Sequence, residues 1–307
     1  MAYHASAHPL TPVHTLAAER ISAGYDNRII LQDVSLEIPP GRISAIIGAN
    51  ASGKSTLLKT LARIIRPVSG TVLLDGRPIH RLPSRQFARI VGLLPQSPIV
   101  PEGISVADLV GRGRFPHQRM FGGWSRKDYE AVAEAMDMMN ITELANANID
   151  ELSGGQRQRV WIAMALAQQT DILFLDEPTT FLDITYQVEI LDLLTDLNRT
   201  LGKTIVMVLH DINLAARYAD YLFAMKNGRL AAQGTPSEVI TRETVRDVFG
   251  LECAVIPDPV SSSPAIVPIG RHHAAHSHAA SGSATEKAAN HTDGSREAAA
   301  AAEIGHS

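Results

Sequence analysis

The chain of 307 residues has a single cysteine, Cys253, so no disulfide can form within it. We therefore expect a reducing compartment, and we interpret Cys253 as a small apolar core residue rather than a reactive thiol. No apolar run approaches the ~20 residues that a membrane-spanning helix needs. Residues 1–10 also lack the charged and then apolar pattern of a secretion signal. If the protein works at a membrane, we expect it to dock onto other subunits.

The chain also lacks an excess of basic residues. Its 28 lysines and arginines are outnumbered by 32 aspartates and glutamates, which gives a formal net charge of −4. Such a chain produces no overall positive field for gripping nucleic acid, so we expect no nucleic-acid partner. The composition is ordinary for a globular protein, and the length suffices for one large domain or two modest ones.

Both ends of the chain differ in composition from the middle. Residues 1–14 carry scattered His, Pro and Ala without periodicity, and residues 271–307 are rich in Ala, His, Ser and Gly with no apolar face. We predict disordered tails there, flanking one domain over residues 15–270. Metal binding is the alternative role for the C-terminal tail, because it contains His272, His273, His276 and His278.

Between the tails, strand and helix patterns alternate, which predicts a mostly parallel sheet with helices on its faces. Continuous apolar runs predict fully buried strands at residues 43–47, 172–175 and 204–209. Helices are predicted at residues 54–65, 125–140, from 153 onward, and 186–201. The stretch 87–167 is rich in helix signals and interrupts the strand pattern, so we interpret it as an inserted helical subdomain.

Three local signals refine these boundaries. Ser125 and Asp128 form a capping-box pattern at the start of one predicted helix. Gly202 is suited to the left-handed position that ends another. Residues 226–229, Lys-Asn-Gly-Arg, lie between apolar strands and predict a hairpin turn.

The strongest chemical signal is a glycine-containing loop that follows a buried strand and opens a helix, the context of a phosphate-binding loop. Successive backbone N–H groups and the helix N-terminus would form a concave site for β- and γ-phosphates. Lys54 adds a positive charge, and Ser55 offers a hydroxyl ligand to Mg²⁺. A glycine-rich turn with a surface lysine is the alternative, but it does not explain the strand and helix on either side. The predicted nucleotide-binding residues are Gly48, Ala49, Asn50, Ala51, Ser52, Gly53, Lys54, Ser55 and Thr56.

Polar residues follow the other buried strands, where ligands bind in open α/β sheets. Asp176 is the expected Mg²⁺ partner, and Glu177 is placed to act as general base on the attacking water. His210 follows a third strand and could hydrogen-bond the γ-phosphate. Gln96, after Leu-Leu-Pro at residues 93–95, could reach Mg²⁺ or the attacking water. Three strands that deliver such residues to one edge predict a single catalytic site.

A second phosphate-binding surface is predicted where Leu-Ser-Gly-Gly-Gln, residues 152–156, opens a helix. One small nucleotide cannot easily use both surfaces of a monomer. The simplest arrangement is two copies of the chain, each capping the nucleotide that the other holds. Tyr25 could stack on adenine, an interaction worth ~1–3 kcal/mol in nucleic-acid complexes, or could be a plain surface tyrosine. The residues assigned to this second surface are Ser153, Gly154, Gly155 and Gln156.

Taken in order, the phosphate loop, Gln96, the LSGGQ sequence, Asp176-Glu177 and His210 resemble an ABC ATPase over roughly residues 17–271. The resemblance implies an α/β P-loop NTPase (RecA-like) core with an antiparallel β subdomain and an inserted helical subdomain. It further implies a head-to-tail homodimer with ATP and Mg²⁺ at its interface. Such subunits lie at the cytoplasmic face of the membrane and work with permease subunits and an extracytoplasmic substrate-binding protein.

Finer features are similar to the ATPase subunits of ferric-siderophore importers of the enterobactin and hydroxamate type. They are residues 111–118 (GRGRFPHQ), 179–183 (TTFLD), 209–213 (LHDIN) and a closing stretch, 253–271, that contains Asp258. Haem and cobalamin importers share parts of these features, so they stay open as alternatives. A soluble ABC ATPase acting on nucleic acid or the ribosome is a further alternative, although such proteins usually carry two ATPase units or long insertions.

Two positions depart from the family pattern in the phosphate loop. Ala49 stands where proline is frequent, and this restores a backbone N–H. Ala51 stands where glycine is frequent, and a left-handed conformation there would cost an alanine ~1–2 kcal/mol. The basic segment 112–127 is either a solvated loop or a contact surface, and we expect residues 112–117 to touch the permease.

Overall fold

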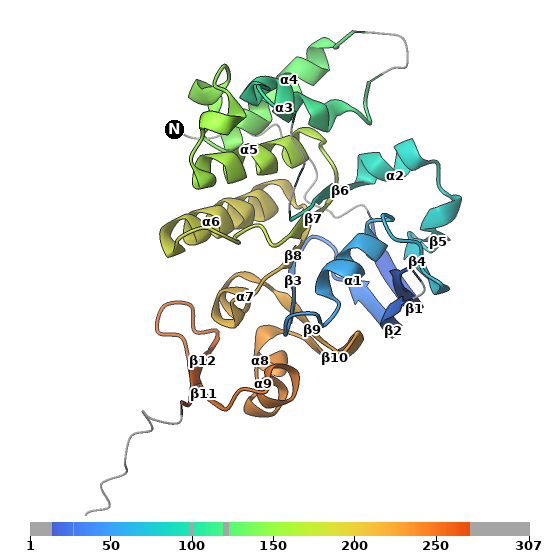
Figure 1. Ribbon diagram of the computed structural model, residues 1–307, viewed down its shortest axis with the longest axis vertical. Helices are drawn as coiled ribbons and strands as arrows, with labels where there is room; N and C mark the ends of the chain where they lie inside the picture. The colour runs from blue at the N-terminus through green and yellow to red at the C-terminus, as the bar shows by residue number, and fades with distance from the viewer. Residues whose placement is uncertain (1–13, 27, 97, 99–100, 119–122, 271–307) are drawn as a thin grey trace, which may run out of the picture. The chain divides into compact units, whose positions relative to one another are not determined.

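The computed structural model describes residues 14–26, 28–96, 98, 101–118 and 123–270, and in it the three predicted apolar strands lie side by side in one sheet (Figure 1). The strands of this main sheet are β3 (Ile43–Gly48), β6 (Val91–Leu94), β7 (Ile172–Asp176), β8 (Thr204–Val208), β9 (Tyr221–Lys226) and β10 (Arg229–Gly234). Their order is β10-β9-β3-β8-β7-β6, and every neighbouring pair is parallel except β10-β9 at one edge. The predicted mostly parallel sheet is confirmed.

The main sheet is buried on both faces, which explains why its strands are continuously apolar. In β8, Ile205 and Met207 belong to one core cluster, and the alternate residues Val206 and Val208 belong to another. This follows from the period of two along a strand, which sends successive side chains to opposite faces. The first cluster packs under helices α5 (Gly154–Ala167), α6 (Ile184–Leu201) and α7 (Ile212–Tyr218).

A second sheet is antiparallel and has the strand order β2-β1-β4-β5. Helix α1 (Lys54–Leu61) packs against the inner face of this sheet and against the main sheet, and its Leu57, Leu58 and Leu61 are fully buried. The antiparallel strands are β1 (Leu16–Tyr25), β2 (Arg28–Ile38), β4 (Ser69–Leu74) and β5 (Arg77–Pro78). The fold class expected from the sequence, including its antiparallel part, is therefore confirmed.

Between β6 and β7 the chain leaves the main sheet and forms a helical insertion, drawn in green in Figure 1. In it, α3 (Val106–Gly111), α4 (Arg126–Met138) and α5 pack against one another. The predicted insertion began at residue 87, inside α2 (Ser84–Ile90). The structure places the next element, β6, in the main sheet, so the chain departs from the sheet only after Leu94.

The remaining elements lie at the C-terminal end of the described chain. They are α8 (Pro236–Val239), α9 (Arg242–Phe249) and a separate two-stranded sheet of β11 (Cys253–Pro257) and β12 (Pro264–Pro268). Short 3-10 turns occur at Ile79–Arg81, Arg112–Arg114, Thr142–Leu144 and Ile149–Glu151. Cys253 is fully buried, and burial raises the pKa of its thiol, as expected for an unreactive core residue.

The predicted local signals are confirmed, but one helix end was wrong. Ser125 and Asp128 form a reciprocal capping box at the start of α4, and Gly202 ends α6 with a φ of 63°. Residues 226–229 form the β9-β10 turn. Helix α1 was predicted to reach residue 65 but ends at Leu61, because Arg63 has a φ of 62°, which an α-helix cannot continue.

Both predicted tails, with the four tail histidines, lie outside the described residues except for His14. The His14 ring nitrogen Nδ1 lies 2.7 Å from Asp75 Oδ2 in the turn between β4 and β5, so this residue belongs to the folded part. Among the described residues, no helix is both long enough and apolar enough to cross a membrane.

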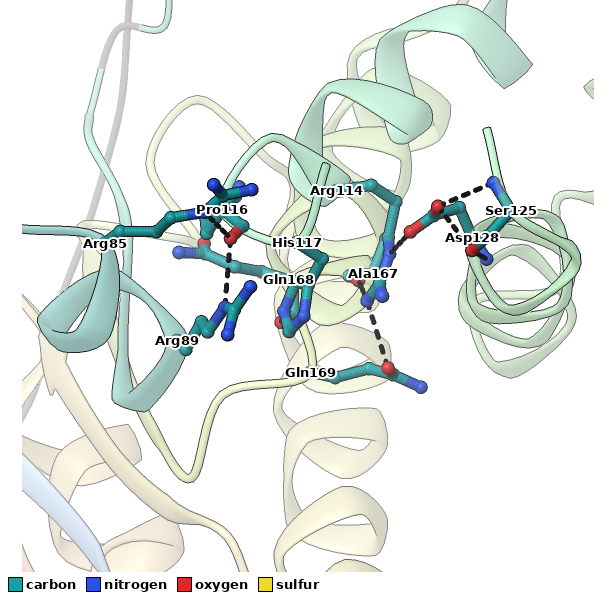
Figure 2. Close-up of polar contacts among 10 residues, drawn as sticks. All are labelled: Arg85, Arg89, Arg114, Pro116, His117, Ser125, Asp128, Ala167, Gln168 and Gln169. Carbon is teal, nitrogen blue, oxygen red and sulfur yellow. Dashed lines mark hydrogen bonds and ion pairs between the residues drawn. The ribbon is translucent and has the colours of Figure 1, made fainter. Parts of the chain in front are cut away.

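A buried ion pair joins two helices of the insertion (Figure 2). Arg114 is 4% exposed, and its Nε donates to Asp128 Oδ1 of α4 over 3.0 Å. Its Nη1 donates to the carbonyl of Ala167, at the end of α5, over 2.7 Å. The Ser125 hydroxyl and backbone N–H, together with the Arg114 guanidinium, lower the pKa of Asp128 from 3.8 to about 2. Asp128 therefore stays ionised opposite Arg114 at neutral pH.

We predict that Asp128→Asn lowers the free energy of unfolding by about 3 kcal/mol at pH 7, because it leaves Arg114 buried without its counter-charge. Because the pKa of Asp128 is lowered in the folded state, its carboxylate stabilises the wild type above the ordinary pKa of an aspartate. This difference in the free energy of unfolding is lost as the pH falls toward 2. Denaturant titration at pH 7 and between pH 4 and 2 measures both effects. Asp137→Asn is the control, since Asp137 is an exposed aspartate of the same helix. An equal stability difference at all pH values would contradict the assignment.

Candidate functional site

The polar residues predicted to gather at one sheet edge do lie there. Parallel pairing aligns Leu94 with Leu175, and Asp176 with Val208, so β6, β7 and β8 end together. Val208 is also aligned with Ile46 of β3, whose end leads into the phosphate loop. The register of adjacent strands thus brings residues from four distant parts of the chain to one place.

The phosphate loop, residues 48–55, is a tight turn whose backbone favours glycine at two points. A Cβ on Gly48 would lie 2.4 Å from the carbonyl oxygen of Met225, so β9 leaves no room for a side chain there. Gly53 precedes α1 with a φ of 101°, a conformation that residues with side chains rarely adopt. Ala51 has a φ of 61°, so this alanine does sit in the left-handed region where the cost is ~1–2 kcal/mol.

Lys54 is the cation of this loop and is only 6% exposed. Its Nζ donates to the carbonyl oxygens of Gly48 over 2.9 Å and of Ala49 over 3.2 Å, so the ammonium lies within the curve of the loop. Burial lowers its pKa, whereas the nearby carboxylates of Glu177 and Asp176 act in the opposite direction. A buried cation surrounded by backbone groups is suited to an anionic ligand such as a phosphate.

Ser55 and Asp176 form a pair of oxygen donors beside the loop. The Ser55 hydroxyl donates to Asp176 Oδ1 over 2.8 Å, while Asp176 Oδ2 is buried and has no hydrogen-bond partner among the described residues. Lys59 Nζ lies 3.8 Å from that second oxygen. Burial raises the pKa of Asp176, opposed by the Ser55 hydrogen bond and by both lysines. A hydroxyl beside a buried carboxylate oxygen that accepts no hydrogen bond from the described residues is a donor set that fits Mg²⁺.

Glu177 is held by three side chains, which together we call the Glu177 cluster. His210 Nε2 lies 2.7 Å from Glu177 Oε1, the Thr180 hydroxyl donates to Oε2 over 3.1 Å, and the Gln96 amide donates to Oε2 as well. The Glu177 side chain is 9% exposed, and its backbone has a φ of 57°. Such a conformation is costly for a residue with a side chain and is often found at functional sites. The carboxylate is therefore fixed and oriented.

The structure unites Gln96, Glu177 and His210 in one cluster, and Ser55 with Asp176 in the neighbouring pair. Gln96, which we expected near Mg²⁺ or the attacking water, makes its described side-chain hydrogen bond to Glu177. Tyr25 ends β1 in the antiparallel sheet and is 47% exposed.

The LSGGQ residues lie elsewhere, at the start of α5 in the helical insertion (Figure 1). Ser153 and Gln156 bond to each other's backbone as a capping box, which defines the first turn of the helix. Gly155 packs on the Tyr186 ring of α6, where an added Cβ would lie 2.9 Å from the ring. Among the described residues no hydrogen bond joins this helix start to the phosphate loop.

Two residues of the site were missed in the sequence, Thr180 and Lys59. Lys59 follows Ser55 by four residues on α1, and this spacing places both on one face of the helix. That periodicity could have identified Lys59 as a second cation near Asp176. Thr180 follows Glu177 by three residues in a loop, and no periodic pattern indicates that its hydroxyl turns back to the carboxylate.

Comparison with known proteins places this geometry in a family. The protein family described as ABC transporter matches this chain over residues 31–180. The ferric enterobactin transport ATP-binding protein FepC of Escherichia coli (strain K12) is 49% identical over 259 residues, covering 84% of this chain and 96% of FepC. The petrobactin import ATP-binding protein FpuD of Bacillus anthracis is 49% identical over 256 residues, covering 83% of this chain and 94% of FpuD.

Solved structures agree with the sequence comparison. The ATP-binding cassette MJ0796, solved as a dimer in a post-hydrolysis state with ADP and Pi, matches with a TM-score of 0.63 at 30% identity. The match covers 72% of this chain and 98% of the MJ0796 chain. With the phosphate loop, the Glu177 cluster and the LSGGQ helix in place, this chain belongs to the ATP-binding proteins of the ABC transporter family.

Proposed function

We propose that the chain hydrolyses ATP and uses it to power import of an iron(III)–siderophore complex. The observation that carries the hydrolytic part is the Glu177 cluster beside the phosphate loop. Backbone N–H groups and Lys54 bind the phosphates, and Glu177 accepts a proton from the attacking water. His210 and Gln96 contact the Glu177 carboxylate and orient it. His210 would also hydrogen-bond the γ-phosphate.

Ser55 and Asp176 would hold Mg²⁺, since they offer a hydroxyl and a carboxylate oxygen that accepts no hydrogen bond from the described residues. When bound, the ion stabilises negative charge on the phosphate oxygens. Lys59 Nζ lies 3.8 Å from Asp176 Oδ2, and its charge opposes the rise in the pKa of that carboxyl that burial causes.

A second copy of the chain would complete the site in a head-to-tail dimer. The separation of the phosphate loop from Ser153, Gly154, Gly155 and Gln156 supports this arrangement, as does the dimer of the related MJ0796 cassette. Next to Glu177, Phe181 is 96% exposed and Ile184 at the start of α6 is 63% exposed. Exposed apolar side chains beside a catalytic carboxylate are expected where a partner covers the site.

The siderophore assignment is supported by the relatives, which are named for transport of ferric enterobactin and import of petrobactin. We propose a peripheral subunit at the cytoplasmic face of the membrane, bound to permease subunits that receive their ligand from an extracytoplasmic binding protein. In this scheme residues 15–270 are the ATPase domain and the two ends of the chain are tails.

Residues 111–118, here called the GRGRFPHQ segment, are proposed to face the permease. Arg85 and Arg89 of α2 both donate to the Pro116 carbonyl, over 2.8 and 3.0 Å, and the His117 ring bonds to the carbonyl of Gln168 (Figure 2). Immediately before these two anchored residues, Phe115 is 79% exposed. These bonds hold the segment against both α2 and the end of the helical insertion. Helix α2 is followed by β6, which leads to Gln96.

We predict that Glu177→Gln retains ATP binding but lowers ATP turnover by about 10²- to 10⁴-fold, because the general base is lost. The variant should also accumulate as a dimer in the presence of ATP, because hydrolysis no longer separates the two copies. Phosphate release and analytical ultracentrifugation measure the two effects. Glu243→Gln on the exposed face of α9 is the control. Unchanged turnover in the Glu177 variant would overturn the assignment of the base.

The transported ligand is tested by reconstituting the chain with its permease and binding protein in vesicles. ATP-dependent uptake is then compared for a ferric siderophore, haem and cobalamin. We predict uptake of the ferric siderophore alone, and loss of that uptake with Glu177→Gln. Uptake of haem or cobalamin instead would replace the siderophore assignment while leaving the ATPase assignment intact.

Charge reversal in the GRGRFPHQ segment should uncouple transport from ATP hydrolysis. We predict that Arg112→Glu reduces uptake at least about tenfold, as expected for the loss of an interface arginine, and leaves the ATPase rate of the isolated chain within about twofold. Arg77→Glu, an exposed arginine of β5, is the matched control. Normal uptake by the Arg112 variant would reject this surface as the permease contact.

A further inference from the structure

The C-terminal hairpin of β11 and β12 is attached directly to α7, the helix that follows His210. Its first attachment is Asn213, whose side-chain amide bonds to the backbone of Ile266 in both directions. Asn213 Nδ2 donates to the Ile266 carbonyl over 3.2 Å, and the Ile266 N–H donates to Asn213 Oδ1 over 2.8 Å. A paired amide contact of this kind fixes both the distance and the orientation of β12 on the helix.

The second attachment lies one helical turn further along α7. Arg217 Nη2 lies 3.0 Å from Asp258 Oδ1 and 3.1 Å from Oδ2, in the loop between β11 and β12. Asn213 and Arg217 are four residues apart and so share one face of the helix. The backbone N–H groups of Ser261 and Val260 and the Arg217 guanidinium hold the pKa of Asp258 well below its usual range, so the carboxylate is ionised at neutral pH.

Helix α7 connects these attachments to the Glu177 cluster with little freedom between them. Only Asp211 separates His210 from the helix, and its carboxylate caps the first turn by accepting from the Leu214 N–H over 2.9 Å. At the other end of the helix, the Tyr218 hydroxyl donates to Asp192 of α6 over 2.9 Å. Because α7 begins two residues after His210, its contacts at Asn213 and Arg217 lie within about two helical turns of the His210 backbone.

We propose that this C-terminal hairpin positions His210 for ATP hydrolysis. Asn213 with Ile266, and Arg217 with Asp258, hold α7, and α7 sets the place of the His210 imidazole 2.7 Å from Glu177. These residues are positioning residues and do not touch the nucleotide. The inference rests on the proposed hydrolytic roles of Glu177 and His210. It gives a role to the closing stretch of the chain, including Asp258, that the nucleotide site leaves unexplained.

The test variant is Asp258→Asn, which keeps an oxygen to accept from the loop N–H groups and removes the charge opposite Arg217. We expect kcat for ATP hydrolysis to fall about three- to tenfold with KM for ATP within about twofold, since a small misplacement affects the reaction more than binding. The matched control is Glu252→Gln. Glu252 immediately precedes β11 but pairs with Arg246 of α9, 3.0 Å away, so its loss should leave kcat unchanged.

A second step separates positioning from general loss of structure. Asp258→Asn is combined with His210→Ala, and all rates are measured where circular dichroism shows the chains fully folded. If the hairpin acts through His210, Asp258→Asn causes no further loss in the His210→Ala background. Should Asp258→Asn not fold, Asn213→Ala removes the other attachment and is expected to give the same pattern.

Three outcomes would overturn the inference. The hairpin would have no part in positioning His210 if Asp258→Asn lowered kcat by the same factor with and without His210, or left kcat unchanged in the folded single variant. Either result would leave the proposed roles of Glu177 and His210 intact. Full turnover in His210→Ala by itself would instead overturn the proposed role of His210, and the hairpin inference would fall with it.

Discussion

The site depends on one constraint, the fixing of the Glu177 carboxylate by groups from neighbouring strand ends. Gln96 follows β6, Glu177 follows β7 and His210 follows β8, and these three strands are consecutive in the main sheet. A shift in register between any two strands would separate the contacts, because each residue along a strand moves a side chain by about 3.3 Å. Burial of both faces of the sheet prevents such a shift, because it would move apolar side chains out of the core. Core packing therefore fixes the contacts to the Glu177 carboxylate.

Helices that adjoin these strands make polar contacts further from the sheet. In the insertion, Arg114 pairs with Asp128 inside the protein, and the adjacent Pro116 carbonyl receives two arginines of α2. At the other side of the site, α7 carries the hairpin contacts toward His210. The two proposals, for the GRGRFPHQ segment and for the C-terminal hairpin, both connect the Glu177 cluster to surfaces away from the nucleotide. Under these proposals, contacts at those surfaces affect ATP hydrolysis.

Much of this arrangement could be predicted from the sequence, because short-range patterns encode it. Buried strands appear as continuous apolar runs, the Ser125 cap and the Gly202 end have local signatures, and parallel strand ends share an edge. The end of α1 could not be predicted, since no residue type marks the left-handed Arg63. The Thr180 contact and the attachment of Asp258 to α7 depend on loop paths and on pairs 3 and 41 residues apart, for which the sequence has no periodic signal.

In the proposed dimer, each nucleotide is clamped between the phosphate loop of one copy and the LSGGQ helix of the other. A crystal structure with Mg²⁺ and a nonhydrolysable ATP analogue tests this most directly. We predict that the γ-phosphate lies between Lys54 of one copy and Ser153 of the partner subunit, with Glu177 facing the position of the attacking water. A nucleotide bound away from Lys54, or a dimer in which the LSGGQ helix points away from the nucleotide, would contradict it.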